Sequence, residues 1–196
     1  MLKNLEVEII KSPTESDWAI TKLLALTTMG NNEVRTMTPQ WKNMILKSEH
    51  SPIRTLEVIW RWYNLPSWVS THFVRHKIGI EHFVQSQRND RQPKYDRNYA
   101  PQSYPVLHAC RANVQAIINI SKVRLCNKAS KETTYAWNFF LNELAKVNPE
   151  IVSFCVPTCV YRGGICPEPR SCGYNNTEAF VVAEEQYLKT LKGENE

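Results

Sequence analysis

Residues 72–91 read HFVRHKIGIEHFVQSQRNDR and bring together histidines, arginines, a lysine and the polar run Gln85-Ser86-Gln87. So many cationic groups in one small supersecondary unit repel one another unless an anion joins them, and phosphate is the usual anion. A solvated basic face is the plainer interpretation of a charge run. The apolar residues on either side favour a position beside the core, so we expect an anion-binding site here.

The segment before this unit predicts the elements that carry it. Residues 55–64 (TLEVIWRWYN) alternate apolar and mostly polar positions and form the clearest strand pattern in the chain. Residues 64–66 break that strand, and Pro66 begins a predicted helix that runs through Lys77. Three basic residues spaced three and four apart would then project from one face of this helix: His72, Arg75 and His76.

The remaining chain predicts an α+β fold. Residues 5–10 (LEVEII) alternate like a strand, and the polar residues 85–105 predict an extended loop. Apolar periodicity and capping residues predict helices at 15–27, 38–47, 104–126, 130–146 and 177–191. Because no repeat, low-complexity tract or linker divides the chain, we expect residues 1–196 to form a single domain with an antiparallel or mixed sheet and long helices.

Composition limits the class of protein. A hydrophobic fraction of 42% with six tryptophans supplies a proper core and argues against disorder. The net charge of +5 suits an anionic ligand such as a nucleotide, but falls short of a dedicated nucleic-acid coat. Residues 1–11 (MLKNLEVEIIK) carry charges throughout, unlike a signal peptide, and no apolar run reaches the length of a bilayer span. These features predict a cytoplasmic protein.

The six cysteines then need an explanation other than disulfides, because the cytosol keeps thiols reduced. Cys110 and Cys126 fall within the predicted helix at 104–126 and are interpreted as small core residues. The other four crowd into residues 155–172 (CVPTCVYRGGICPEPRSC), which resembles a metal or iron–sulfur knuckle. That run lacks the close C-x-x-C pair typical of zinc sites. We therefore predict free thiols in a Pro/Gly-rich loop, with no metal site.

The chemistry of the basic unit fits phosphate recognition. Such a site uses a forked arginine, a hydroxyl and amide groups, which Arg75, Ser86, Gln87 and Arg88 offer. The chain has only six glycines and no Gly-rich loop after a strand, which argues against a Rossmann or P-loop nucleotide site. A nucleotide or flavin must then be held by side chains, alone or with those of a second subunit.

Three sequence elements resemble the flavin-dependent thymidylate synthases, the ThyX family. Arg75-His76-Lys77 followed after eight residues by Ser86-Gln87-Arg88 is similar to the family signature of Arg-His-Arg, seven or eight residues, Ser and then Arg. His50-Ser51-Pro52 resembles the family's upstream His-Ser/Thr-Pro element, and Arg170 and Glu178 keep the separation of its late Arg and Glu. The resemblance covers residues 5–100 in order and the last part of the chain more weakly.

Membership of this family would imply a ThyX-like fold and a homotetramer with active sites built at subunit interfaces. Each site would hold FAD and carry out the reductive methylation of dUMP to dTMP, with methylenetetrahydrofolate and NADPH as co-substrates. Reduced flavin would act as hydride donor and one-carbon relay, with no cysteine attacking the pyrimidine.

The resemblance also implies roles for individual residues. FAD would contact Ser51, Arg75, His76 and Lys77. The dUMP site would be lined by His72, Arg75, Ser86, Gln87 and Arg88, with Ser86 to Arg88 holding the phosphate. Arg170 would lie against the uracil and favour ionisation at N3, which makes C5 more nucleophilic.

Several positions depart from the family pattern. Lys77 keeps a positive charge but loses the bidentate fork of the signature's second arginine. Val84 or Gln85 stands where Glu or Gln is usual, and His72 stands where Gln is common. Ser153 replaces an arginine that binds the nucleotide in the family. A segment between Pro157 and Arg170 is also shortened. Two alternatives within the family are therefore a flavin enzyme that modifies C5 of another pyrimidine nucleotide and an inactive relative.

The alternative outside the family is a basic nucleic-acid-binding module. Its aromatic stacking surfaces would be Trp60, Trp62, Tyr95 and Tyr99.

Overall fold

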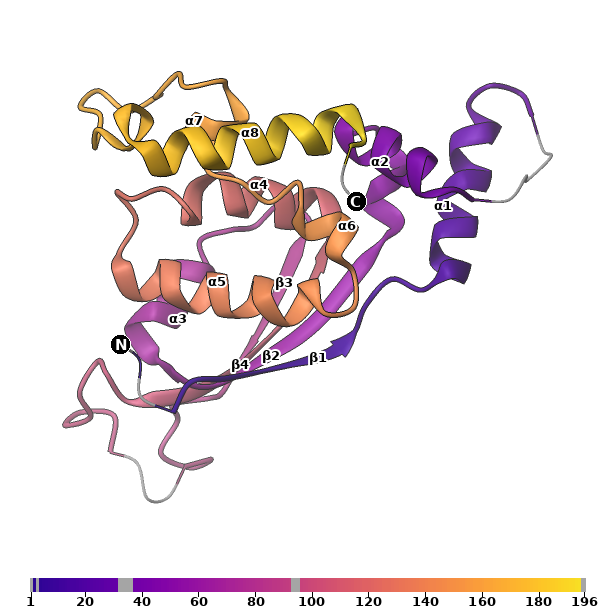
Figure 1. Cartoon of the computed structure of the whole chain (residues 1–196). Coiled ribbons are helices and arrows are strands. Elements are labelled where there is room, and N and C mark those ends of the chain that lie inside the picture. Colours follow the sequence, from indigo (N-terminus) through magenta and orange to yellow (C-terminus); the bar gives the residue numbers. More distant parts are fainter. Residues whose placement is uncertain (1, 3, 32–36, 93–95, 195–196) are drawn as a thin grey trace.

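A four-stranded antiparallel sheet in the order β1-β2-β4-β3 forms one layer of the computed structural model (Figure 1). The strands span Glu6–Lys11 (β1), Glu57–Pro66 (β2), Ile80–Val84 (β3) and Pro105–Asn113 (β4). The structure describes residues 2, 4–31, 37–92 and 96–194. The predicted α+β class with an antiparallel sheet is confirmed.

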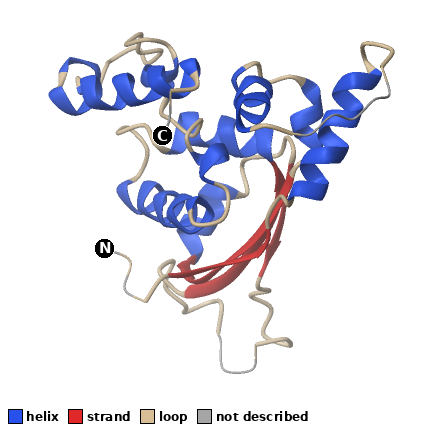
Figure 2. Cartoon of the chain, turned by 45° about the vertical axis from the view of Figure 1, so that its right-hand side comes forward, coloured by secondary structure: helices blue, strands red, loops and turns tan. Residues whose placement is uncertain are grey.

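Most of the helices described gather on one side of the sheet, and the helix at residues 15–27 lies beyond one end of it (Figure 1 and Figure 2). Side-chain oxygens of Thr14, Thr38, Asn113, Ser130 and Thr177 accept the first free backbone N–H groups and so fix where five of them begin. The α-helices are Glu15–Thr27 (α1), Pro39–Lys47 (α2), Ser67–Phe73 (α3), Val114–Arg124 (α4), Lys131–Ala145 (α5), Pro149–Val152 (α6), Thr158–Tyr161 (α7) and Glu178–Lys192 (α8). Two 3₁₀ helices are Ser51–Thr55 (η1) and Tyr174–Asn176 (η2).

The core lies between β2 and the helices, and it is strongly aromatic. Val58, Trp60 and Trp62 alternate along β2 and are fully buried on the helix side. Trp60 stacks on Phe140 of α5, with ring centroids 4.1 Å apart, and Trp62 stacks on Phe73 of α3 at 4.6 Å. Aromatic pairs at these separations contribute beyond their buried area.

The buried tryptophans correct one prediction. Trp60 and Trp62 have no exposed surface, so they cannot stack on the bases of a nucleic acid. Tyr99 is exposed as that alternative requires, and Tyr95 lies outside the described residues.

The predicted helix from Pro66 through Lys77 is too long. Helix α3 ends at Phe73, and residues 74–79 form a turn that leads into β3. Gly79 adopts a left-handed φ of 71°, which a continuing helix does not allow, and the short strand β3 was not predicted. His72 therefore lies on the helix, whereas Arg75 and His76 lie in the turn, and their predicted common face is wrong.

The predicted helix at 104–126 is in fact a strand followed by a helix. Residues 105–113 form β4, whose inward side chains alternate, and Asn113 then caps α4. Cys110 is buried as predicted, but on a strand. The strand expected at 5–10 and the helices expected at 15–27, 38–47, 130–146 and 177–191 are confirmed to within a residue or two at each end.

The cysteines are free thiols in the structure. Four of them line a cavity of about 440 Å³ between the end of α4 and residues 157–175: Cys126, Cys159, Cys166 and Cys172. The loop predicted at 155–172 also contains the short helix α7. No helix within the described residues is long and apolar enough to cross a bilayer.

Replacing Gly79 by alanine should destabilise the protein by about 2–3 kcal/mol. A methyl group at Gly79 would lie 2.6 Å from Asn113 Nδ2 and would displace the cap of α4, in addition to straining a positive φ. Gly30→Ala is the matched control, because Gly30 has a similar φ of 68° with no atom within 4 Å of the added methyl. Urea unfolding followed by circular dichroism measures both losses. Equal losses for the two variants would contradict the steric part of this account.

Candidate functional site

The turn at residues 74–79 carries the predicted Arg75-His76-Lys77 motif and connects α3 to β3. Arg75 and Lys77 are exposed, and neither forms an ion pair with any residue that the structure describes. The turn and one side of α4 border a cavity of about 340 Å³, lined by Arg75, His76, Lys77, Ile78, Ala116, Asn119 and Ile120. Two cations thus lie beside a partly apolar hollow.

Arg124 at the end of α4 holds the turn in place. Its Nε–H donates to His76 Nε2 at 2.8 Å, and its terminal nitrogen donates to the His72 carbonyl at 2.6 Å. The guanidinium also lies over the Phe73 ring, 6.0 Å from its centroid. The sequence analysis missed Arg124, because a basic residue in the last turn of a helix is common and signals no site.

The histidines contribute less charge than the sequence suggests. Burial, followed by the neighbouring Arg124 and His82, lowers the pKa of His76 to about 4. The pKa of His72 is also lowered, first by burial and then by Arg124 and Arg75. Both rings are therefore neutral near pH 7, and the positive charge around the turn comes from Arg75, Lys77 and Arg124.

His72 is directed toward α5. Its Nδ1 lies 3.0 Å from Thr133 Oγ1, and its ring packs edge-on against Trp68. The backbone carbonyl of His72, not its ring, is the group that joins the Arg124 network.

Ser86-Gln87-Arg88 follow β3 in the loop that begins at residue 85. Gln87 Nε2 donates to Ser67 Oγ at 2.9 Å, which ties this loop to the start of α3. Ser86 Oγ accepts the Arg88 N–H at 3.3 Å, and the Arg88 guanidinium donates two hydrogen bonds to Asp90 at 2.9 and 2.8 Å. Both partners of the Arg88–Asp90 pair are exposed. Such pairs contribute at most about 1 kcal/mol, so an incoming phosphate can replace Asp90.

Two predicted site residues lie elsewhere in the subunit. Ser51 is exposed at the start of η1, and Arg170 is exposed in the loop between α7 and η2. Among the described residues, neither side chain hydrogen-bonds the 74–79 turn. Their roles at the flavin and the uracil stay predictions.

The residue before the His50-Ser51-Pro52 element is anchored to α4. Glu49 has a left-handed φ of 46° and forms an ion pair with Lys122 at 2.9 Å. Burial raises the pKa of Glu49, but hydrogen bonds from Lys122, Gln115 and Tyr161 more than offset this, so the pKa lies below its ordinary value of 4.5.

Glu49→Gln should lower stability by about 1 kcal/mol at neutral pH, because the ionised carboxylate is the form that the fold stabilises. The pKa of Glu49 is lower in the folded protein than in the unfolded chain. The stability that its charge provides is therefore complete above the unfolded-chain pKa and is lost as the pH falls through the folded-state pKa. The Tm difference between wild type and variant should therefore shrink as the pH drops below about 4.5. Glu143→Gln, in the Lys146 pair near the surface, is the control and should change little. A Glu49 effect that is the same at neutral and acidic pH would contradict the ion-pair explanation.

Comparison with known proteins identifies similar folds. No family model and no curated protein matches this sequence. Thymidylate Synthase X (ThyX) from Helicobacter pylori, in a crystal structure with FAD and dUMP, superimposes with a TM-score of 0.61 and 15% identity, covering 78% of this chain and 99% of that chain. A second structure of that enzyme with FAD and dUMP gives the same score and identity, covering 77% and 99%. The UMP/dUMP methylase PolB from Streptomyces cacaoi, bound with 5-Br dUMP, gives a TM-score of 0.56 and 14% identity, covering 74% and 91%. At these identities the likeness establishes a ThyX-like fold.

Proposed function

We propose that this chain is a flavin-dependent enzyme that reductively methylates dUMP to dTMP, with FAD as cofactor and methylenetetrahydrofolate and NADPH as co-substrates. One observation carries the proposal. The fold is similar to that of enzymes crystallised with dUMP or its bromo analogue. In this fold Arg75-His76-Lys77, which resemble the first part of the family signature, lie on a turn with exposed cations beside a cavity. The fold alone does not determine the chemistry, so the argument depends on these residues.

The residues around the cavity fit FAD. The cofactor combines a diphosphate with a flat, largely apolar ring. Arg75 and Lys77 offer positive charge for the diphosphate, since neither has an ion-pair partner among the described residues, and Ile78, which is 90% exposed, offers apolar surface. His76 would contribute a neutral ring at the same place, and Ser51 would complete the flavin contacts. When bound, reduced FAD supplies the hydride that completes the new methyl group.

The nucleotide would be held by the turn and the loop that follows β3. Arg75 and Arg88 would bind the phosphate, with Arg88 exchanging Asp90 for a phosphate oxygen, while the Ser86 hydroxyl and the Gln87 amide add hydrogen bonds. His72 would line the same site. Arg170 would lie against the uracil and stabilise negative charge at N3, so that C5 becomes more nucleophilic.

A homotetramer with shared sites fits the placement of these residues. Within one subunit Ser51 and Arg170 make no hydrogen bond to the 74–79 turn, so a neighbouring subunit would bring them to the flavin and the uracil. The outer face of the sheet exposes Phe83 and Leu107, and burial of such residues stabilises subunit contacts. Residues 1–196 would act as one domain in this assembly.

Product formation tests the function directly. The purified chain is incubated with FAD, NADPH, methylenetetrahydrofolate and dUMP, and the nucleotides are analysed by mass spectrometry. We expect dTMP, and its formation should depend on every component.

A parallel reaction with UMP tests the second candidate, a methylase of pyrimidine ribonucleotides, which the similarity to PolB favours. If neither nucleotide is methylated by protein loaded with FAD, the proposed activity is wrong. Salt-dependent oligonucleotide binding without flavin would favour the nucleic-acid-binding alternative.

A further inference from the structure

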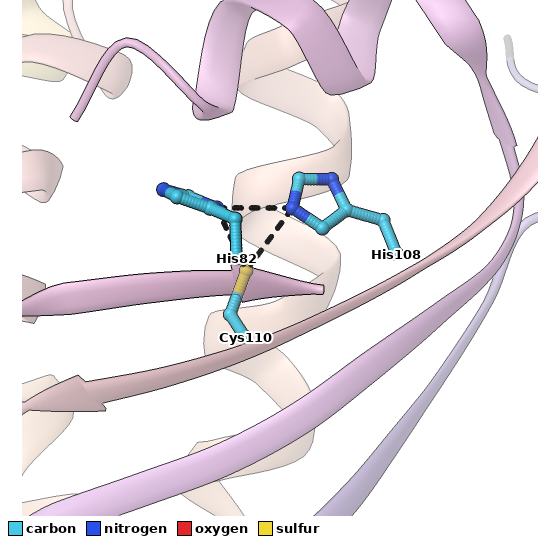
Figure 3. Close-up of side chains that lie close together, drawn as sticks. All are labelled: His82, His108 and Cys110. Carbon is cyan, nitrogen blue, oxygen red and sulfur yellow. Dashed lines mark hydrogen bonds between the residues drawn. The ribbon is translucent and has the colours of Figure 1, made fainter. Parts of the chain in front are cut away.

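Two histidines and a cysteine converge on the helix side of the sheet, next to the 74–79 turn but outside the residues assigned above (Figure 3). His82 Nδ1 lies 3.0 Å from His108 Nε2. Cys110 Sγ lies 3.3 Å from each of these nitrogen atoms. Within the described residues, this is the one group of metal-ligating side chains whose donor atoms lie so close together.

The register of the sheet explains the cluster. His82 on β3 is the direct cross-strand partner of Cys110 on β4, and His108 lies two positions from Cys110 on the same strand. Because side chains alternate along a strand, all three project from one face. His108 and Cys110 have no exposed surface, so these donors are held on rigid elements, and the half-buried His82 marks the side on which solvent reaches the cluster.

The outer nitrogen atoms of both rings already have partners. His82 Nε2 lies 3.0 Å from the His76 carbonyl, which can only accept a hydrogen bond, so the proton is on Nε2 and the lone pair of Nδ1 faces the cluster. His108 Nε2–H donates to that lone pair at 3.0 Å, and His108 Nδ1 accepts a hydrogen bond from Ser70 Oγ–H at 3.1 Å. When a metal ion binds, the His108 proton would move to Nδ1 and be donated to Ser70 Oγ, which leaves the Nε2 lone pair for the ion. Metal-binding histidines typically show this pattern, in which the other nitrogen hydrogen-bonds to a carbonyl or hydroxyl and fixes the tautomer.

We propose that His82, His108 and Cys110 bind a zinc ion. Tetrahedral zinc holds nitrogen and sulfur ligands about 3.3–3.6 Å apart, and the observed separations of 3.0–3.3 Å reach this range with small movements. A set of two imidazoles and one thiolate suits a borderline-soft ion and excludes magnesium and calcium, which prefer oxygen. On binding, the S–H bond of Cys110 breaks, its proton passes to solvent, and a sulfur–zinc bond forms; water supplies the fourth ligand.

Such an ion would stiffen the support of the 74–79 turn. It would cross-link β3 to β4, and the His82–His76 hydrogen bond would transmit that restraint to the residue after Arg75. This inference does not depend on the proposed enzymatic function, since its readouts are metal binding and not turnover.

Cobalt is the spectroscopic probe for the test. The full-length protein is stripped of metal with a chelator, its fold is checked by circular dichroism, and Co²⁺ is added. We expect one equivalent to bind with a thiolate-to-cobalt charge-transfer band and the intense visible bands of tetrahedral cobalt, and Zn²⁺ to abolish both. If the stripped wild-type protein is folded but shows no charge-transfer band with Co²⁺, the proposal is wrong, and no variant is needed to reach that conclusion.

Substitutions locate the ion. Cys110→Ser should abolish the charge-transfer band, and Ser70→Ala should weaken cobalt binding by roughly 10–100-fold because it removes the support of His108. Cys155→Ser is the matched control, since Cys155 is also buried but is not part of the cluster, and it should keep the band. If the band survives in Cys110→Ser but is lost in Cys159→Ser, the ion occupies the cysteine-lined cavity and the proposed site is wrong.

Discussion

Arg75→Ala should lower the affinity for both FAD and dUMP by roughly 30- to 150-fold, or about 2–3 kcal/mol for each ligand. Arg75 is the one residue assigned to both ligands, and its exposed guanidinium has no ion-pair partner among the described residues that could restrain it. The substitution should not destabilise the fold, because the charge of Arg75 repels that of Arg124. Burial is the main cause of the lowered pKa of Arg124, and Arg75 is the second cause. Flavin fluorescence and calorimetric titration with dUMP measure the two affinities.

Two further variants sharpen this prediction. Arg75→Lys should fall between wild type and Arg75→Ala, because lysine keeps the charge but loses the fork. Arg162→Ala removes another exposed arginine, which follows α7, and should leave both affinities unchanged. If Arg75→Ala binds FAD and dUMP as tightly as wild type does, the site has been assigned to the wrong surface.

Trp62→Ala should produce the largest loss of stability, about 3–5 kcal/mol, which is a large part of the total for a domain of this size. Trp62 is fully buried, stacks on Phe73, and packs edge-on against His108 with ring centroids 5.5 Å apart. Its indole N–H donates to the Ala136 carbonyl at 3.1 Å, and that carbonyl, which lies within α5, would lose this additional donor. Removal of the indole would leave a cavity that borders both α3 and β4.

Urea unfolding followed by circular dichroism measures this loss. Trp41→Ala is the control, since Trp41 is only half-buried and packs edge-on against Trp18 at the other end of the molecule. Its loss should be clearly smaller. Similar losses for the two variants would show that the core is not centred on β2.

The sequence predicts the fold wherever one periodicity is unambiguous. The alternation in residues 55–64 and 5–10 has a period of two over a full strand, so both strands were located. The run Val106 to Val114 fits both periods, and no Gly or Pro separates β4 from α4, so the sequence pattern predicts one long helix. The chain direction changes at Asn113, whose side chain caps α4.

That error also concealed the His82–His108–Cys110 cluster. Residues two apart on a helix point in different directions, whereas on a strand they share a face. Once residues 105–113 are a strand, His108 and Cys110 become neighbours. The unpredicted strand β3 then places His82 opposite Cys110.

The candidate site was predictable in part. The motif spacing singles out Arg75, His76 and Lys77 as candidates, and the structure places these three neighbours beside one cavity; their roles at a ligand stay predictions. The role of Arg124 and the neutral state of His72 and His76 were not predictable, because they depend on contacts of the turn with α4 and of His72 with α5, which are distant in sequence.

The most direct test of the proposed function is the visible absorbance spectrum of the purified protein as dUMP is added. We expect a yellow protein, either as isolated or after loading with FAD, with flavin bands that shift when dUMP binds. In Arg75→Ala loaded with FAD, the same shift should need a much higher dUMP concentration. A folded, colourless protein that cannot be loaded with FAD would contradict the account, as would a flavin spectrum indifferent to dUMP and to UMP.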